Sequence, residues 1–357
     1  MKILALNSSP RTGRNSKTEL LLNCLVEGMR AAGAEVYAVN LRERTVETCI
    51  GCYFCWTKTP GQCVHKDDMT DELLPELLAS DLVIYATPLY NRTMNATMSI
   101  FRERTLPLFQ PFLENHDGKM VFQTRYKLPA AVWLSVCGQP EESEFDLLSS
   151  YINRTRHQAT SIMAEIYRTS SEVITHPVFR KELSDILEST RQAGRELVRS
   201  KNISQETMER IKRPIMEPDM FSIAENLTWQ ACIANGLTNQ EFIDKGLIPR
   251  PDTLENFMAI SVRGLNIEAV VDRKVILQFT FSGTVAGACY FTIENRTITA
   301  VAGVSDTDDV GIETPFELWM DIMTGKIDGR EMFLQRKYHV EGDLDLMLQL
   351  FQGHQRP

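Results

Sequence analysis

The segment KILALNSSPRTGRNSKTELL, residues 2–21, decides how the chain begins to fold. Residues 2–7 form an apolar run that is typical of a β-strand covered on both faces of a parallel sheet. Ser16 is a suitable N-cap, so we expect a helix to follow and to end at Gly33. The polar residues between strand and helix therefore lie at a helix N-terminus, where free N–H groups and the helix dipole favour an anion.

This polar loop combines short hydrogen-bonding side chains with positive charge. The hydrogen-bonding groups belong to Ser8, Ser9, Asn15, Ser16 and Thr18, and the charges to Arg11, Arg14 and Lys17. The spacing matches neither a Walker A loop nor the dinucleotide-binding glycine fingerprint. The loop is predicted to hold a phosphate group, and the plainer alternative is a polar N-cap with solvated charges.

Strand-like and helix-like segments alternate as far as residue 200. Further strands are expected at 35–41, 81–88, 130–138 and 163–169, with helices at about 94–109 and 178–198 and an acidic helix start within 67–80. This alternation predicts an α/β fold with a flavodoxin-like, doubly wound parallel five-stranded sheet of order 2-1-3-4-5. Polar loops at 87–96 and 136–142 follow the third and fourth strands, so we expect them beside the phosphate loop.

Four of the eight cysteines lie in the segment TCIGCYFCWTKTPGQCVHKDDM, residues 48–69. Cys49, Cys52 and Cys55 are spaced at intervals of three, and Cys63 follows after a longer gap. Iron–sulfur proteins use such compact spacing, and clustered cysteines in a reducing compartment are more often ligands than structural disulfides. The alternatives are bare thiols, a zinc site, and a disulfide between Cys55 and Cys63.

The last third of the chain has a different pattern. Residues 201–250 are irregular and partly helical, and they are predicted to connect two domains, at 1–200 and 251–357. After Asp252 apolar and polar residues alternate with period two, which predicts an antiparallel sheet, and helices are expected at 314–326 and 343–352. Eight apolar residues on these helices could line a tunnel or fill a core: Leu318, Met320, Met323, Met332, Phe333, Leu346, Leu350 and Phe351.

Length and charge narrow the class of protein. A chain of 357 residues is too long for one comfortable core, so two domains are expected. The net charge of −9 argues against nucleic-acid binding. No apolar run approaches the roughly 20 residues that a membrane span needs. The short apolar N-terminus does not resemble a signal peptide, so a cytoplasmic location is expected.

Two families resemble this sequence. NSSPRTGRNS resembles the phosphate loop of the NADPH-dependent FMN reductases, and the cysteine segment followed by DLVIYATPLY is similar to their iron–sulfur flavoprotein branch. The resemblance covers roughly residues 1–200. It implies that Ser9, Arg11, Asn15 and Ser16 hold the FMN phosphate. It also implies that a second group lies along the isoalloxazine ring, namely Thr87, Pro88, Leu89, Tyr90, Asn91, Cys137 and Gly138.

The iron–sulfur branch carries a [4Fe-4S] cluster, and its ligands would be Cys49, Cys52, Cys55 and Cys63. The C-terminal part resembles the sterol-carrier-protein type two fold, an α+β domain that can enclose acyl chains or sterols. The matching residues are Trp319, Gly325, Lys326, Gly342 and Asp343.

These resemblances imply an FMN-dependent oxidoreductase. NAD(P)H would supply hydride, and the electrons would pass to a small acceptor such as a quinone or a flavin, or to an iron–sulfur centre. One alternative is a ferredoxin-linked electron-transfer flavoprotein, and another is a lipid-binding protein with a degenerate flavin domain. A homo-oligomer is expected, and the choice between NADH and NADPH is left open.

Overall fold

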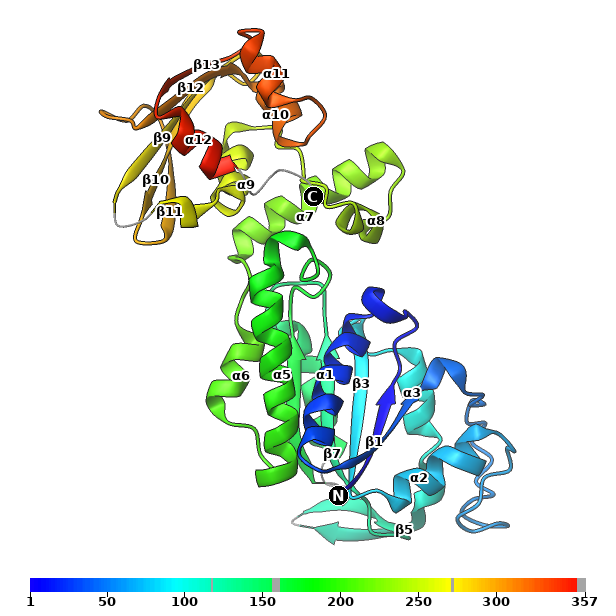
Figure 1. The fold of residues 1–357 in the computed structure, drawn as a ribbon. Helices are drawn as coiled ribbons and strands as arrows, with labels where there is room; N and C mark the ends of the chain where they lie inside the picture. Colours follow the sequence, from blue (N-terminus) through cyan, green and yellow to red (C-terminus); the bar gives the residue numbers. More distant parts are fainter. Residues whose placement is uncertain (117, 156–160, 271–272, 352–357) are drawn as a thin grey trace. The chain divides into compact units, whose positions relative to one another are not determined.

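The computed structural model describes residues 1–116, 118–155, 161–270 and 273–351 (Figure 1). The chain divides into two compact units. The first unit contains residues 1–175 and 179–215, and the second contains residues 176–178 and everything from residue 216 onward.

The first unit is built around a parallel sheet with the strand order β2-β1-β3-β7-β8. The predicted order 2-1-3-4-5 is therefore confirmed. The strands are β1 (Lys2–Asn7), β2 (Glu35–Asn40), β3 (Leu82–Tyr90), β7 (Ala130–Val136) and β8 (Ile162–Arg168). The inner strands β1, β3 and β7 are buried over nearly their whole length, because helices cover both faces.

One face of this sheet is covered by helices α1 (Lys17–Ala31) and α5 (Arg180–Ser200), which lie side by side (Figure 1). As expected, the side chain of Ser16 caps α1, and Gly33 follows its end with a φ of +89°. The two helices approach closely at two glycines. A Cβ on Gly28 would lie 1.9 Å from the Arg191 carbonyl oxygen, and one on Gly194 would lie 2.1 Å from that of Leu25.

The other face packs against helices α2 (Leu74–Ala79), α3 (Ala96–Glu103) and α4 (Asp146–Thr155). Their apolar residues share one core with the strands, in which Trp133 is stacked on Tyr85 with ring centroids 4.7 Å apart. A last helix of this unit, α6 (Gln205–Lys212), packs against α5.

Two hairpins in the first unit differ from the expectations. The polar segment after the third strand is a tight turn from β3 into β4 (Thr93–Met94), with Asn91 and Arg92 at φ values of 49° and 64°. The helix expected at 94–109 ends at Glu103; a turn and a short 3-10 helix (Leu106–Leu108) follow, and Phe109 begins an antiparallel hairpin. That hairpin consists of β5 (Phe109–His116) and β6 (Lys119–Thr124).

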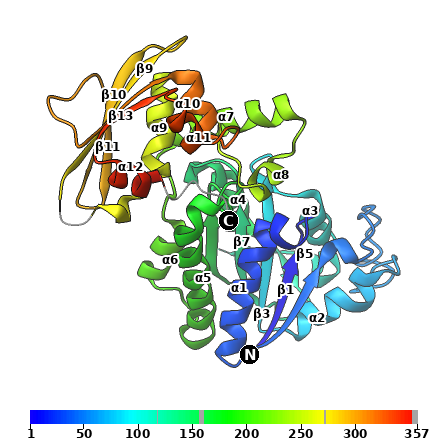
Figure 2. The same cartoon turned by 45° about the horizontal axis from the view of Figure 1, so that its top comes forward.

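The second unit begins with helices and continues with a five-stranded sheet of order β11-β10-β9-β12-β13 (Figure 2). The sheet is mixed, since β12 runs parallel to β9, so the expectation of a purely antiparallel sheet was wrong for this pair. The helices are α7 (Pro218–Asn235), α8 (Asn239–Asp244), α9 (Leu254–Gly264), α10 (Phe316–Met323), α11 (Gly329–Leu334) and α12 (Leu344–Phe351). The strands are β9 (Val275–Ser282), β10 (Gly287–Glu294), β11 (Thr297–Ala302), β12 (Val310–Pro315) and β13 (His339–Gly342).

Aromatic side chains fill the core of the second unit. The Phe257 ring of α9 meets Phe279 and Phe281 of β9 edge to face, with centroids 5.0 and 4.9 Å apart. Among the residues expected to line a tunnel or fill a core, Met320 and Leu350 are fully buried in this cluster. These two side chains therefore fill the core.

Among the helices that the structure describes, none combines the length and the apolar character that crossing a bilayer requires.

We expect trypsin to separate the two units at a single bond. Helix α6 ends at Lys212, and the segment that leads to α7 begins with Arg213, which is exposed, and Pro214. Because trypsin does not cut before proline, cleavage should follow Lys212 and leave fragments 1–212 and 213–357. Lys212→Gln should abolish the cut, and mass spectrometry of the fragments measures both results. A first cut inside α5, or one uncut core in the wild-type protein, would show that the boundary lies elsewhere.

Candidate functional site

The loop after β1 is tied to the neighbouring strand and then leads into α1. The Ser8 N–H donates to the Ala86 carbonyl oxygen at 2.9 Å, which fixes the start of the loop against β3. The Ser16 hydroxyl accepts the Glu19 N–H as the N-cap of α1 and lies 2.8 Å from the Ser9 hydroxyl. Residues 10–15 are exposed, and Gly13 has a φ of +56°. The exposed part of the loop thus lies directly before the positive end of the α1 dipole.

Charged side chains hold the backbone of this loop in place. Arg42, from the segment after β2, donates to the carbonyl oxygens of Ser9 and Arg11, each at 3.3 Å. Nη1 of Arg11 lies 2.8 and 2.9 Å from the two carboxylate oxygens of Glu172. Glu172 follows β8, so this ion pair joins the loops that follow the first and fifth strands.

The segment after β3 is joined to the same loop by a buried asparagine. Nδ2 of Asn95 donates to the Ser8 carbonyl oxygen at 2.7 Å, and its backbone N–H donates to the Thr87 hydroxyl. The Ser135 hydroxyl of β7 donates to the Thr87 carbonyl oxygen at 2.8 Å. Of the residues predicted here, Thr87 and Pro88 are buried, whereas Tyr90 and Asn91 lie on the exposed turn.

The loop after β7 contains Cys137 and Gly138. Cys137 is 3% exposed, and its thiol donates to the Gln139 carbonyl oxygen. Burial, reinforced by the charge of Glu144, raises the pKa of the Cys137 thiol to about 12. The side chain is therefore a neutral wall of the site and is not a nucleophile. Gly138 is close to Glu172, since a Cβ there would lie 3.3 Å from the Glu172 Cγ.

Hydrogen bonds thus connect the loop after β1 with the segment after β3, and they join the ends of β3 and β7. Most of the predicted residues lie in or beside these segments. Thr18 differs from the other predicted residues, because it belongs to the first turn of α1 and is buried there. Sequence reasoning missed Arg42, Asn95 and Glu172. Arg42 and Glu172 follow the second and fifth strands, and a search of every strand end would have found them.

The residues of this loop fit a phosphate ester. Ser9 accepts hydrogen bonds from the Ser16 hydroxyl and from the Arg11 N–H, which leaves its own proton available for a ligand. The guanidinium of Arg11 is half exposed and bound only to a surface carboxylate, so it can turn to an anion at little cost.

The cysteine loop, residues 48–66, is anchored to the first unit by a buried ion pair. Arg104 follows α3 and contacts both carboxylate oxygens of Asp67, at 2.6 and 3.0 Å. Both side chains are 1% exposed. The Arg104 guanidinium also donates to the Glu47 carbonyl oxygen at 2.6 Å, so one side chain holds the segments on both sides of the loop.

Two aromatic contacts hold the middle of the loop. Nε1 of Trp56 donates to the Leu106 carbonyl oxygen at 3.1 Å, and the Trp56 ring packs against Phe122 of β6 with centroids 5.0 Å apart. The β5–β6 hairpin, which was not foreseen, therefore supports the cysteine loop.

The four cysteines of the loop line one hollow. Burial raises the pKa of the Cys55 thiol, and the nearby Cys63, Cys52 and Cys49 raise it further. All eight cysteines lie in the described residues and are unpaired, so the disulfide alternative is not formed. In the described ranges, no three His, Cys, Asp or Glu side chains are arranged closely enough to hold a metal ion.

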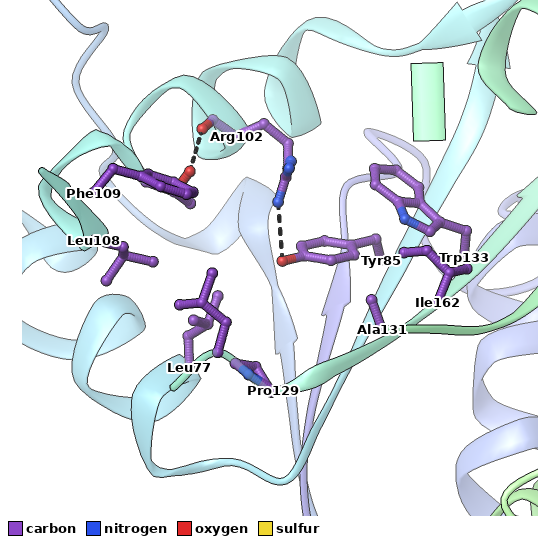
Figure 3. A pocket seen from close by; sticks show the side chains of 11 residues that line it. Leu77, Tyr85, Arg102, Leu108, Phe109, Pro129, Ala131, Trp133 and Ile162 are labelled. Carbon is purple, nitrogen blue, oxygen red and sulfur yellow. Dashed lines mark hydrogen bonds between the residues drawn. The ribbon is translucent and has the colours of Figure 1, made fainter. Parts of the chain in front are cut away.

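A second hollow, which Figure 3 shows, is lined by Arg102 of α3. The guanidinium of Arg102 reaches the Tyr85 hydroxyl at 3.2 Å, and Trp133, Leu77 and Phe109 form apolar walls. None of the loop cysteines lines this hollow. Arg102 and Arg104 thus line different hollows, although only one residue separates them in the sequence.

Comparisons with known proteins match the two ends of the chain to two different families. Residues 1–132 match the family of NADPH-dependent FMN reductases, and residues 269–352 match the SCP-2 sterol transfer family. The two family resemblances expected from the sequence are thereby confirmed.

Among curated relatives, the chain is similar to iron–sulfur flavoproteins of two archaea. One, from Archaeoglobus fulgidus, is 31% identical over 154 residues, which are 43% of this chain and 61% of the relative. Another, from Methanocaldococcus jannaschii, is 30% identical over 132 residues, which are 37% of this chain and 61% of the relative. The chain thus spans about three fifths of the length of these two relatives.

Solved structures similar to this chain include an NAD(P)H:quinone oxidoreductase from Methanothermobacter marburgensis. It is 19% identical, covers 55% of this chain and 96% of its own, and has a TM-score of 0.42. An FMN-dependent NADH-azoreductase from Bacillus anthracis, solved with FMN, is 12% identical with the same TM-score and covers 55% of this chain and 99% of its own.

The Asp67–Arg104 pair should make stability depend on pH. Burial opposes ionisation of Asp67, but Arg104 and two backbone N–H groups outweigh it and lower its pKa to about 2. The stabilisation is therefore complete above the ordinary value of 3.8 and is lost as the pH falls toward 2. We expect Asp67→Asn to destabilise the protein by about 3–5 kcal/mol at neutral pH, because Arg104 loses its buried partner.

Urea unfolding followed by circular dichroism, at neutral pH and near pH 3, measures this effect. The difference between Asp67→Asn and wild type should shrink at the lower pH. Asp71→Asn, at an exposed position one turn further on, should change little at either pH. An equal difference at both pH values would contradict the assignment of the pH dependence to Asp67.

Proposed function

We propose that this protein is an FMN-dependent oxidoreductase. Its first unit matches the FMN reductases, and its second unit matches the SCP-2 family. The protein takes hydride from NAD(P)H and passes electrons to a small acceptor such as a quinone or a flavin. The observation that carries this proposal is that the loop after β1 is hydrogen-bonded to β3 and to the segment after it, while β3 is hydrogen-bonded to the end of β7. The loops after β1, β3 and β7 therefore start at one edge of the sheet. In open α/β sheets, ligands bind at this edge.

The chain's own residues bind and orient the cofactor in this proposal. Ser9, Asn15 and Ser16 would hold the FMN phosphate, and Arg11 would contribute charge. Thr87–Asn91 would lie along the ring, together with Cys137 and Gly138. FMN supplies the hydride and electron chemistry when bound. The neutral thiol of Cys137 offers the ring a wall without a charge of its own.

Arg11→Ala tests the phosphate contact. The change removes one charge-assisted hydrogen bond, worth about 1.5–3 kcal/mol, so FMN affinity should fall at least about tenfold. Riboflavin lacks the phosphate, and its affinity should change little. Fluorescence titration of the apoprotein with each flavin measures both values. Equal losses for the two flavins would refute this role of Arg11.

Glu172→Gln is the matched control for that experiment. It removes the carboxylate that pairs with Arg11 but leaves the guanidinium in place. FMN should therefore bind this variant at least as tightly as the wild type. A tenfold loss would mean that the ion pair, and not Arg11 alone, forms the phosphate site.

We also propose that Cys49, Cys52, Cys55 and Cys63 hold a [4Fe-4S] cluster, which would supply one-electron transfer. The specific observation in favour is that all four line one hollow. The names of the curated relatives point in the same direction. With such a cluster, transfer to or from a ferredoxin becomes the main alternative to a small acceptor.

Anaerobic reconstitution tests the cluster. Wild-type protein should contain about four iron and four sulfide per chain. Cys52→Ala should lose most of both, while Cys24→Ala, which changes a buried cysteine of α1, should retain them. Fewer than one iron per wild-type chain would exclude the cluster and leave bare thiols.

For the second unit, the SCP-2 match supports lipid binding. A hollow lies at the ends of β9 and β12, with Phe281, Phe333 and Leu334 among its walls. Binding of an acyl chain or a sterol in this hollow stays a prediction. The homo-oligomer and the cytoplasmic location also stay predictions.

A further inference from the structure

Arg104 is fixed more firmly than any surface arginine could be. Its Nη1 donates to Asp67 and to the Glu47 carbonyl oxygen, and its Nη2 donates to Asp67 and to the Thr70 hydroxyl. The residue is 1% exposed, so the guanidinium cannot reorient without breaking buried contacts. Its positive charge therefore has a permanent position in the molecule.

Arg104 is also one of the residues that line the cysteine hollow. Nε of Arg104 is buried and makes no hydrogen bond to any residue that the structure describes. Among the four cysteines of this hollow, Cys63 raises the pKa of the Arg104 guanidinium, both by its charge and as a side-chain hydrogen-bond partner. His65 lines this hollow as well, and its Nε2 is likewise buried without a partner in the described part of the chain.

Buried donors of this kind rarely stay unpaired, since an unsatisfied polar atom costs about 1–3 kcal/mol. Two such nitrogens beside four thiols therefore point to an acceptor rich in negative charge. Thiolates and the sulfides of a cluster meet this description, whereas neutral thiols accept hydrogen bonds weakly.

We propose that Arg104 is the positioning residue of the four-cysteine site: it donates Nε–H to a sulfur of the bound cluster and places a fixed positive charge beside Cys63. This inference rests on the proposed cluster. Hydrogen bonds to sulfur and nearby charge set the potential of such a cluster. A fixed cation stabilises the reduced form, which carries one more negative charge, so Arg104 raises the reduction potential.

The other cations near the loop do not share this placement. The Arg125 guanidinium binds the carbonyl oxygens of Phe109 and Cys55, and Lys58 lies over the Phe54 ring. Neither lines the hollow. Arg102 faces the Tyr85 side of α3 (Figure 3), which makes it a suitable control.

Three variants of the full-length protein test the role of Arg104. Arg104→Lys keeps a charge but removes Nε. The double variant Arg104→Met with Asp67→Asn removes both charges and so avoids an unpaired buried ion. Arg102→Lys makes the same chemical change two residues away. Each protein is reconstituted anaerobically, iron and sulfide are counted, and the cluster midpoint is measured by a redox titration followed by electron paramagnetic resonance.

We expect the cluster midpoint of the double variant to shift to a more negative potential, with iron content unchanged, because the lost guanidinium lines the hollow whereas the lost Asp67 carboxylate does not. Arg104→Lys should shift it in the same direction by less, and Arg102→Lys should match the wild type. The FMN midpoint, read from absorbance, should be the same in all four proteins. If Arg104→Lys is folded by circular dichroism but loses iron that Arg102→Lys retains, the positioning role is supported as well.

An unchanged cluster midpoint in the double variant would overturn the inference while leaving the cluster proposal intact. If the double variant does not fold, Arg104→Lys decides, and a midpoint equal to that of the wild type overturns the inference. A wild-type protein that takes up no iron would overturn both proposals together.

Discussion

Parallel pairing of β1, β3, β7 and β8 is the constraint on which the rest of the first unit depends. Because these strands point the same way, every segment that leaves one of them does so at the same edge of the sheet. Residues as far apart in sequence as Arg11 and Glu172 meet there as an ion pair. The candidate flavin site needs no other device to bring its parts together.

The cysteine loop is a long insertion, and it must be fixed against the parallel sheet and its helices. The cysteine loop has little regular structure of its own, and Arg104, Asp67 and Trp56 supply the contacts that fix it. The Asp67–Arg104 pair fixes the cysteine loop, and Arg104 also lines the hollow of the four cysteines. In the role that we propose, Arg104 therefore both stabilises the loop and tunes the cofactor.

The features that could be predicted from sequence are those with a local signature. The apolar run of β1, the N-cap at Ser16 and the end of α1 at Gly33 each follow from neighbouring residues. The β5–β6 hairpin could not be foreseen, because its strands are stabilised by contacts such as that of Phe122 with Trp56, far away in sequence. Arg104 was missed for the same reason, since its partners are set by the fold. The parallel pairing of β9 with β12 is likewise invisible to a period-two pattern, which is the same for both directions.

The contact between α1 and α5 has a mechanical consequence. At Gly28 and Gly194 the two helix backbones touch with no room for a β-carbon, so neither helix can slide or roll past the other. Gly28 lies twelve residues after Ser16, a distance of roughly 18 Å along a helix that rises about 1.5 Å per residue. Helix α1 is therefore fixed near its C-terminal end by α5, and its N-terminal end follows the phosphate loop. A ligand that moves this loop must either bend α1 or move the loop alone, while α1 keeps its place against α5.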